Sequence, residues 1–523
     1  MKNFRLIGLI YFLGFSVLVS CSSDDSNITR PVIPDAPASV SLQEAIFYSI
    51  DLTDRTGDSF KVRVFVDGLT DANAVFQFAA TAPGTYDQMN FGNYVSNFKA
   101  YDEEYEPLDV SKLSKNQWQL ADPVNTAIIE YEIRETWDAV SPPDEIYKMA
   151  GTSIEEDHSL INTFAVMGYP TGLQERKYIL SIDHPSDWLL GTALPENNNG
   201  YYVASDYDHL ADSPILMGDL TSATITIDQT EIDIWTYSAT DLNTSAEIKS
   251  QIEEVMYDAE AFLEELPVDN YTFLYHFGEV SAGALEHSYS SLHVMEQIPV
   301  AQQANWIKYV AAHEFFHIIT PLNIHSEIIE DFNFVTPTPS RHLWLYEGVT
   351  DWAAWLMRYR NNSIALNFLL QEFGYKIRIN ETYFDRSYSL TDISLQSYTQ
   401  AGGEQYSNIY YRGAIVAALL DIRLLELSNG ERGLREVMLE LVAQYGPQNE
   451  FQDDQFFEVF VAMTYPEIAD FIENYIEGTT DLPYAEYFSK IGIQYNPNNY
   501  VLTPVPERTA KQQFLFERWS MNF

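Results

Sequence analysis

The chain has 523 residues, of which 46% are hydrophobic and 20% charged, a composition typical of globular rather than disordered proteins. It contains 29 Lys and Arg residues against 76 Asp and Glu residues, so its net charge is −47 at pH 7. A chain this acidic is repelled by polyphosphate, which argues against nucleic acid as a partner. The length is sufficient for several domains with a large buried core.

The first twenty residues have the pattern of an export signal. Two basic residues precede an apolar run over residues 6–19, and Cys21, the only cysteine of the chain, follows it. This pattern resembles a bacterial lipoprotein signal, in which the cysteine is lipidated and becomes the mature N-terminus. An ordinary secretory signal with an incidental cysteine is the alternative. The sequence therefore predicts a signal peptide over residues 1–20, a flexible tether over residues 21–40, and a lipid anchor on Cys21 in the bacterial cell envelope, at the outer membrane on its periplasmic or surface face.

Residues 41–237 carry the signals of β-strands. Hydrophobic and polar residues alternate over residues 60–66 and 127–133, and turn residues separate such runs. The histidines of this region lack the spacing of metal ligands. We therefore expect an all-β N-terminal domain without a catalytic cluster of its own.

From residue 238 onward the pattern changes to mixed strands and helices. Residues 245–266 predict a helix and residues 271–277 a strand, and a short polar segment follows from Gly283 to Ser291. Beyond residue 345 the chain is mostly helical, with the most apolar helix over residues 411–427. We expect a catalytic domain over residues 238–360, a helical domain that completes the active site over residues 361–495, and an irregular tail over residues 496–523.

The clearest chemical pattern is His313-Glu314-Phe315-Phe316-His317, inside an apolar run over residues 306–319 that predicts a helix. Two histidines four positions apart lie on one face of a helix, about one turn apart. This spacing lets both imidazoles bind one Zn²⁺, with Glu314 beside the metal as a general base. Pro321 is expected to end the helix.

A third zinc ligand is expected at Glu347. A carboxylate that joins two imidazoles leaves the fourth position of the metal open, as catalytic zinc sites require. Asp351 falls one turn further along the same face and is expected to accept a hydrogen bond from the far nitrogen of a ligating histidine. The sequence thus predicts one zinc ion per chain, held by His313, His317 and Glu347.

The sequence HEFFH followed by LWLYEGVT resembles the gluzincin zinc metallopeptidases, which combine HExxH with a glutamate, and specifically the glycyl aminopeptidase family. Three further segments resemble motifs of that family and occur in the same order: residues 81–86, residues 283–287 and residues 410–413. Two departures are visible. Residues 318–323 lack the Trp and basic residues that many members have after HExxH, and Arg412 stands where the family has Lys.

The resemblance implies an α+β multidomain fold, with an N-terminal all-β domain, a thermolysin-like zinc catalytic domain and a C-terminal helical domain. It also implies that Tyr410 donates a hydrogen bond to the developing oxyanion and that Glu286 binds the substrate's free ammonium group. Gly283 and Ala284 would pair with the substrate main chain. Many family members end in a PDZ domain, but we expect none in the residues after Ile493, which are too few for one.

The implied function is a zinc aminopeptidase that hydrolyses the N-terminal bond of peptides with a free N-terminus. Glu314 would assist attack of zinc-bound water, and small first residues such as Gly or Ala would be preferred. Two alternatives stay open: a zinc endopeptidase, in which Glu286 binds no amine, and a non-catalytic surface lipoprotein with a vestigial metal site. The intact Glu314 argues against the second alternative. The natural substrate and the oligomeric state stay open.

Overall fold

The computed structural model of this protein describes residues 36–138, 146–279 and 283–522. The predicted signal peptide, Cys21 and most of the predicted tether lie outside the described residues. Residues from Pro37 onward form one compact unit, so the domain boundaries expected inside it stay predictions. Within the described ranges, no helix combines the length and the apolar character needed to cross a bilayer.

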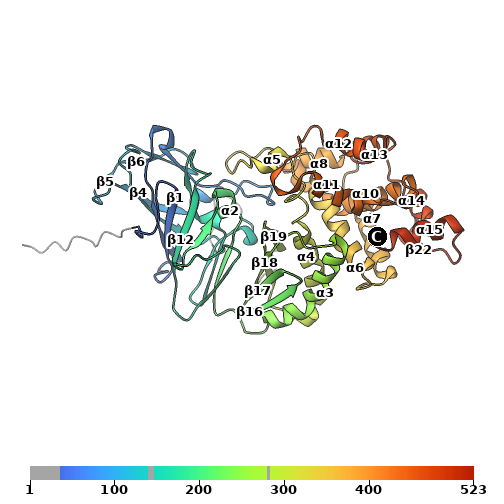
Figure 1. Cartoon of the computed structure of the whole chain (residues 1–523), viewed down its shortest axis with the longest axis horizontal. Coiled ribbons are helices and arrows are strands. Elements are labelled where there is room, and N and C mark those ends of the chain that lie inside the picture. The colour runs from blue at the N-terminus through green and yellow to red at the C-terminus, as the bar shows by residue number, and fades with distance from the viewer. Residues whose placement is uncertain (1–35, 139–145, 280–282, 523) are drawn as a thin grey trace, which may run out of the picture. The chain divides into compact units, whose positions relative to one another are not determined.

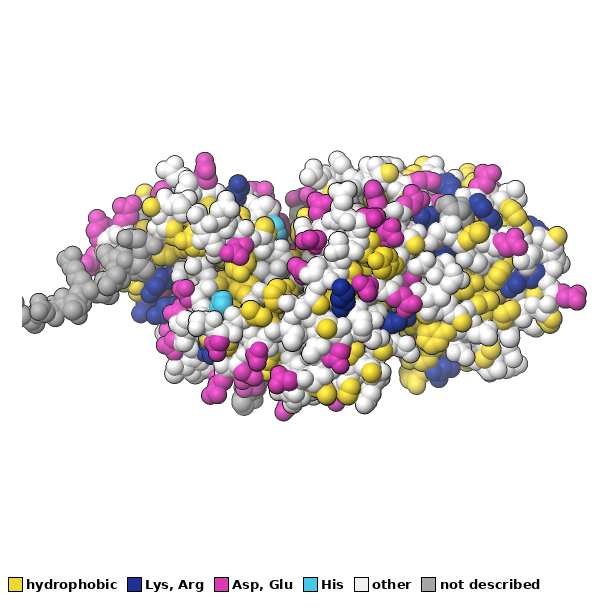
Figure 2. Space-filling view, turned by 60° about the horizontal axis from the view of Figure 1, so that its bottom comes forward, with side chains coloured by type: hydrophobic (Ala, Val, Ile, Leu, Met, Phe, Trp, Pro, Cys, Tyr) yellow, Lys and Arg dark blue, Asp and Glu magenta, His cyan; other side chains and the backbone are white. Residues whose placement is uncertain are grey.

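The order of elements confirms the predicted α+β class. A β-rich N-terminal part is followed by a middle part of strands and helices and then by a helical C-terminal part (Figure 1). Acidic side chains are spread over the face seen in Figure 2 among fewer Lys and Arg side chains, in keeping with the net charge of −47.

The largest sheet of the N-terminal part has seven strands and follows from the alternation of residues. In β2 (Ser59–Phe65), Phe60, Val62 and Val64 are buried on one side, as a period of two dictates. β2 pairs antiparallel with β8 (Ile128–Arg134), so the two runs recognised by their alternation are neighbours. The sheet order is β14 (Tyr202–Ala204), β12 (Lys177–Asp183), β1 (Ala45–Asp51), β2, β8, β4 (Val95–Tyr101) and β5 (Pro107–Leu108).

Two four-stranded sheets and two short helices complete this part. One sheet has the order β13 (Leu189–Thr192), β15 (Ile215–Gly218), β10 (His158–Ile161) and β9 (Ser153–Ile154). The other has the order β11 (Tyr169–Pro170), β3 (Val75–Gln77), β7 (Gln117–Leu120) and β6 (Val110–Lys112). The helices are α1 (Thr163–Val166) and α2 (Tyr207–Ala211). Edge-to-face contacts among Phe76, Phe78, Trp118 and Tyr131 show how the aromatic residues fill this core.

The middle part is built on a five-stranded sheet. Its order is β16 (Thr221–Ile227), β17 (Thr230–Ser238), β18 (Asn270–Gly278), β20 (Ser290–Glu296) and β19 (Gly283–Glu286). β17, β18 and β20 are parallel, whereas β19 pairs antiparallel with β20 and forms an edge of the sheet.

Two sequence expectations differ from this sheet. The sequence places residues 221–237 in the N-terminal domain, but here they form β16 and most of β17, and β17 pairs with β18 of the middle sheet. The sequence also predicts a polar segment from Gly283, whereas these residues form β19 and the start of β20. Alternation and composition identify a strand poorly when it is short, and they do not identify its partner, which tertiary packing selects.

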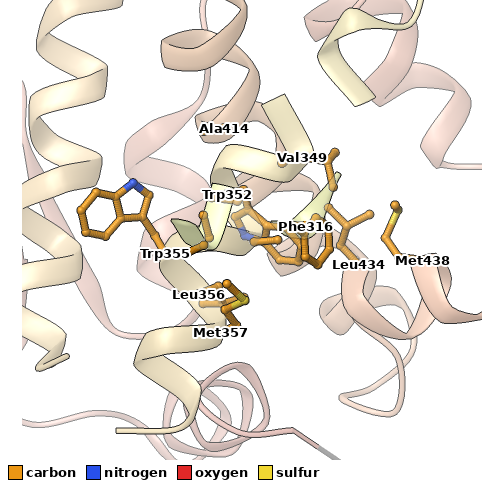
Figure 3. Close-up of a cluster of buried hydrophobic side chains, with 14 of the residues drawn as sticks. Phe316, Val349, Trp352, Trp355, Leu356, Met357, Ala414, Leu434 and Met438 are labelled. Carbon is orange, nitrogen blue, oxygen red and sulfur yellow. The ribbon is translucent and has the colours of Figure 1, made fainter. Parts of the chain in front are cut away.

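Helices cover the middle sheet and carry the central motif. α3 (Ser245–Leu263) begins with a capping box between Thr244 and Glu247. It packs against α4 (Ala304–Phe316), which in turn contacts α6 (Thr350–Arg360). Figure 3 shows Phe316 of α4 beside Trp352 of α6, in a core that Leu434 and Met438 extend. The short α5 (Glu327–Glu330) lies between these helices in the chain.

The C-terminal part is helical, as predicted. Its longest helix, α10 (Asn408–Leu427), is buried along most of its length. It ends where Asn429 and Gly430 adopt positive φ and the Gly430 N–H donates to the Leu425 carbonyl at 2.7 Å, a helix end that glycine favours. The other helices are α7 (Leu366–Tyr383), α8 (Leu390–Leu395), α9 (Gln400–Gln405), α11 (Leu434–Gln444), α12 (Phe456–Met463), α13 (Ile468–Tyr475) and α14 (Tyr484–Lys490).

The prediction of an irregular tail over residues 496–523 is wrong. β21 (Ile493–Asn496) and β22 (Val501–Pro504) form a hairpin, and α15 (Ala510–Trp519) follows. Trp519 is fully buried and its carbonyl accepts a hydrogen bond from Arg360 Nε at 3.0 Å. The capping box between Thr509 and Gln512 was the available sequence signal for this helix.

Candidate active site

The HExxH sequence lies at the C-terminal end of α4. The helix ends at Phe316, and His317 caps it with helical backbone angles, so the one-turn separation of His313 and His317 is kept. The centroids of the two imidazole rings are 4.9 Å apart. The adjacent apolar residues of α4 are buried, which fixes the side of the helix that faces the site.

Glu347 approaches both histidines from a second element. It lies in the π-helical turn Trp344–Val349, directly before α6. Its Oε2 is 3.5 Å from His313 Nε2 and 3.6 Å from His317 Nε2, and all three side chains are buried. Within the described residues, these three form a group whose ligand atoms lie within 4.8 Å of one another. Two imidazole nitrogens and one carboxylate oxygen that converge in this way fit the ligand set of a catalytic zinc ion.

One hydrogen bond orients a histidine of this His-His-Glu triad. His317 Nδ1 donates to the Thr320 carbonyl at 2.8 Å, which leaves the Nε2 lone pair directed toward Glu347. Asp351 lies behind His313, but 3.9 Å separates Asp351 Oδ1 from His313 Nδ1, so the hydrogen bond predicted between Asp351 and a ligating histidine is not formed in this structure.

The Asp351 carboxylate has two other partners that the sequence did not indicate. The Tyr309 hydroxyl donates to it, and the Lys376 ammonium group forms an ion pair with it. Both Asp351 and Lys376 are buried, so the cation compensates a carboxylate that would otherwise be costly in the interior. Lys376 lies on α7, far from the motif in sequence, and no local pattern points to it.

Glu314 and Glu286 face the same space as the triad. Burial raises the pKa of Glu314 to about 7, with the His313 charge opposing and the Glu347 charge adding to this effect. Glu286 lies at the end of edge strand β19, and its carboxylate is within 4.8 Å of the ligand atoms of Glu314 and His317. Burial, followed by the charges of Glu347 and Glu314, raises the pKa of Glu286 well above its usual value.

Tyr410 is brought to the triad by a contact between two glycines. Gly348 follows Glu347, Gly413 lies one turn after Tyr410, and a Cβ added at Gly413 would be 2.9 Å from the Gly348 Cα. This close approach of the two backbones sets the side of α10 that carries Tyr410 beside Glu347. Burial would raise the pKa of Glu347, but its pKa is lower than usual. A hydrogen bond with His313 and the charges of the two imidazoles lower it, and a hydrogen bond with Tyr410 adds to this effect.

The N-terminal part contributes a loop to the site. Gly84 has a φ of +75°, and a Cβ at this position would be 2.4 Å from Glu286 Oε1, so a larger residue would displace that carboxylate. The Tyr86 ring lies 5.1 Å from the Tyr406 ring, and the Tyr406 hydroxyl is 3.2 Å from the Tyr410 hydroxyl. Tyr86 lies in the segment over residues 81–86, but neither it nor Tyr406 was expected in the site.

These residues surround one cavity of about 740 Å³. Of the predicted site residues, it is lined by Gly283, Ala284, Glu286, His313, Glu314, His317, Glu347 and Tyr410. Asp351 lies behind the wall, and Cys21 lies outside the described residues. An HExxH helix whose two histidines meet a glutamate from a second helix defines the class of zinc metallopeptidases with this triad.

Comparison with known proteins identifies the family. The model of the Peptidase M61 N-terminal domain matches residues 47–219, and that of the M61 glycyl aminopeptidase matches residues 307–416. Together the two ranges cover more than half of the chain, which belongs to the M61 peptidase family and is a zinc metallopeptidase of the aminopeptidase type. No curated protein matches the chain.

Solved structures share the fold. An aminopeptidase N family protein of Idiomarina loihiensis superposes with a TM-score of 0.77 at 21% identity, over 86% of this chain and 78% of that chain. The M1 zinc metallopeptidase of Deinococcus radiodurans, in a mutant form bound to a Tyr-Ser-Ala substrate, has a TM-score of 0.52 at 11% identity. That match covers 84% of this chain and 95% of the other. At these identities the likeness concerns the fold alone.

Proposed function

We propose that this protein hydrolyses the N-terminal peptide bond of peptides with a free N-terminus and prefers Gly or Ala as the first residue. The observation that carries the proposal is the convergence of the His-His-Glu triad, Glu314 and Glu286 in one cavity. The family to which the chain belongs is described as glycyl aminopeptidase, which supports the same activity.

In this proposal His313, His317 and Glu347 hold one zinc ion. When bound there, zinc would act as a Lewis acid toward the scissile carbonyl and a water molecule. Glu314 accepts the proton of the attacking water and passes it to the leaving amine. Burial raises its pKa, which favours uptake of the proton from the water molecule.

Glu286 and Tyr410 account for the position and the rate of cleavage. The Glu286 carboxylate receives the substrate ammonium through charge-assisted hydrogen bonds, which places the first peptide bond beside Glu314. The Tyr410 hydroxyl donates a hydrogen bond to the developing oxyanion. This interaction is stronger in the transition state than in the ground state. Burial and then the Glu347 charge raise the pKa of Tyr410, so the hydroxyl stays protonated and able to donate.

The walls around Glu286 support the preference for small residues. The Gly84 backbone approaches the carboxylate closely, and the rings of Tyr86, Tyr406 and Tyr410 line the same part of the cavity. In this proposal these rings and the Gly84 backbone bound the space for the first side chain and favour a small one. The N-terminal sequence adds the proposal that Cys21 anchors the enzyme to a membrane of the bacterial envelope.

A zinc endopeptidase is the second candidate, and one observation favours it. A second cavity of about 410 Å³ lies along residues 286–289 and shares Gly84, Tyr86 and Glu286 with the catalytic cavity. It could receive residues that precede the scissile bond in a longer chain.

Comparison of Ala-Leu-amide with its N-acetylated form separates the two candidates. We expect the free peptide to be hydrolysed at its first bond, with the acetylated form at least a hundredfold slower and all activity lost with a zinc chelator. Equal rates on both forms would establish the endopeptidase instead. A panel of X-Leu-amides then tests the first residue, and faster hydrolysis of Phe or Leu than of Gly and Ala would refute the small-residue preference.

A further inference from the structure

The catalytic cavity extends well beyond the space that a small first residue would fill. Glu286 groups with Glu314 and His317, toward the C-terminal end of α4. Trp306 and Tyr309 line the same cavity from the N-terminal half of α4, seven and four positions before His313. The cavity therefore runs along α4, from Glu286 past the triad to Trp306.

Six aromatic side chains from four helices line this far end: Trp306, Tyr309, Trp355, Phe368, Tyr375 and Tyr411. We name them the aromatic wall. The rings of Trp306 and Tyr309 are 5.5 Å apart, those of Tyr309 and Trp355 are stacked at 4.9 Å, and those of Trp355 and Phe368 are 5.8 Å apart. Tyr375 and Tyr411 make a separate T-shaped contact at 6.1 Å. The aromatic wall is therefore a preformed surface that consists of one row of four packed rings and one separate pair.

Parts of the aromatic wall are unusually exposed for large rings. Trp306 is 49% exposed and Tyr375 is 43% exposed, and both line the cavity. On α6 the two tryptophans diverge: the Trp355 ring lies on the opposite side of the helix from Leu434 and Met438, whereas Trp352 lies in the core (Figure 3). Exposed aromatic residues in a concave site mark a surface that binds ligands.

Lys376, the cation at this end of the cavity, is compensated by an ion pair. Its ammonium group is paired with buried Asp351 and lies 5.4 Å from the Tyr411 ring centroid. Burial raises the pKa of the neighbouring Glu372, with the Lys376 charge opposing this effect. A neutral ring therefore fits this surface better than a charged side chain does.

We propose that the aromatic wall binds the side chain of the substrate's second residue, directly after the cleaved bond, and that the enzyme favours an aromatic residue there. This inference rests on the proposed function. A peptide with its ammonium group at Glu286 and its main chain along the free edge of β19 runs past the triad toward the aromatic wall. Its second side chain then stacks on Trp306 and Tyr375.

The test compares hydrolysis of Ala-Phe-amide and Ala-Ser-amide by the zinc-loaded full-length enzyme. Amides are used so that no terminal carboxylate can meet Lys376. We expect kcat/KM for the Phe substrate to be at least tenfold higher, mostly through a lower KM. In Trp306→Ala and Tyr375→Ala this ratio is expected to fall at least threefold. In the control Tyr383→Ala, which removes a 73% exposed ring of α7 outside the cavity lining, the ratio stays at the wild-type value.

The outcomes separate the two proposals. If wild type cleaves both amides with equal kcat/KM, the aromatic subsite is overturned while the aminopeptidase proposal stands. If it cleaves neither amide, the proposed function fails and the subsite falls with it. A wild-type ratio that persists in both Trp306→Ala and Tyr375→Ala overturns the assignment to these rings.

Discussion

Two buried clusters of histidine and carboxylate invite comparison. One is the His-His-Glu triad of the catalytic cavity. The other, which we name the histidine pair, joins His158 of β10 to His276 of β18, across the N-terminal and middle parts. Their Nε2 atoms are 2.9 Å apart, and His158 Nδ1 donates to Asp157 at 2.9 Å. Asp157 also accepts a hydrogen bond from the Tyr237 hydroxyl at 2.9 Å.

The two clusters differ in where the Nε2 atoms point. In the histidine pair they face each other, so one donates to the other and neither is open to a metal. In the triad both face a carboxylate oxygen. Burial lowers the pKa of His276 and of His158, whereas at His313 the carboxylates of Glu347 and Glu314 outweigh burial and raise the pKa. Convergence on a shared point, rather than burial or histidine content, distinguishes a metal site.

The largest expected effect is the loss of turnover when the base beside the triad is removed. Glu314→Gln keeps the shape of the residue and removes the base, so turnover should fall by roughly 10²–10⁴-fold. Zinc content should stay at one ion per chain, because Glu314 is not a ligand. His276→Gln, the matched change in the histidine pair, should keep both turnover and zinc. Metal analysis and initial rates measure both quantities; turnover that survives in Glu314→Gln would contradict the role of the base. Zinc without turnover in the wild type as well would favour a non-catalytic binding protein.

The second largest effect is expected on the affinity for zinc, which should depend on the triad and not on the histidine pair. Asp351→Asn removes the negative charge that lies 3.9 Å from His313 Nδ1 and should weaken zinc binding by roughly 10–100-fold, the usual effect of changing a carboxylate beside a ligating histidine. Competition with a chromogenic chelator measures this directly. Asp157→Asn, which alters the carboxylate of the histidine pair, serves as the control and should leave zinc affinity unchanged. A similar loss in both variants would mean that the two clusters are coupled.

The contact between Gly348 and Gly413 holds Tyr410 beside the triad. A Cβ on Gly413 would lie 2.9 Å from a backbone atom, so Gly413→Ala should lower the free energy of unfolding by about 1–3 kcal/mol and move Tyr410 away from Glu347. Gly403→Ala on α9 meets nothing within 4 Å and should be neutral or slightly stabilising. Urea unfolding compares the two variants. An unchanged stability of Gly413→Ala would show that α10 can shift without cost.

The smallest effect is expected on the free energy of unfolding as the pH is lowered. Burial, followed by the charge of its partner His158, lowers the pKa of His276 below 6.5, so below that pH the unfolded chain binds more protons than the folded chain. Stability is therefore present above pH 6.5 and is lost as the pH falls toward the folded-state pKa. For one group this loss approaches about 1.4 kcal/mol per pH unit.

His276→Gln removes that proton-linked loss while it keeps a hydrogen-bonding side chain. The difference in unfolding free energy between pH 7.5 and 5.5 should be smaller in the variant than in the wild type, by about 1 kcal/mol. Lys148 and Asp157, the other charged groups that affect His276, are present in both proteins. The same difference in both proteins would show that His276 titrates normally in the folded state.

Local patterns were sufficient for the elements that carry the motif. The helix expected over residues 306–319 corresponds to α4, although α4 ends at Phe316, before the expected stop at Pro321, and the helix expected over residues 411–427 corresponds to α10. Both follow from apolar periodicity, a pattern that acts within a few residues of the chain. The spacing of His313 and His317, and the presence of Glu347 in a later helix, needed no tertiary information.

The tertiary structure decided what lies around that motif. The partners of Asp351, the glycine contact behind Tyr410 and the aromatic wall all join elements far apart in sequence. Such contacts depend on which faces of the helices pack together, and many sequences with the same periodicity could pack differently. The sequence by itself thus determined the metal-binding chemistry, because its spacing is local, whereas the shape of the substrate cavity was decided by long-range packing.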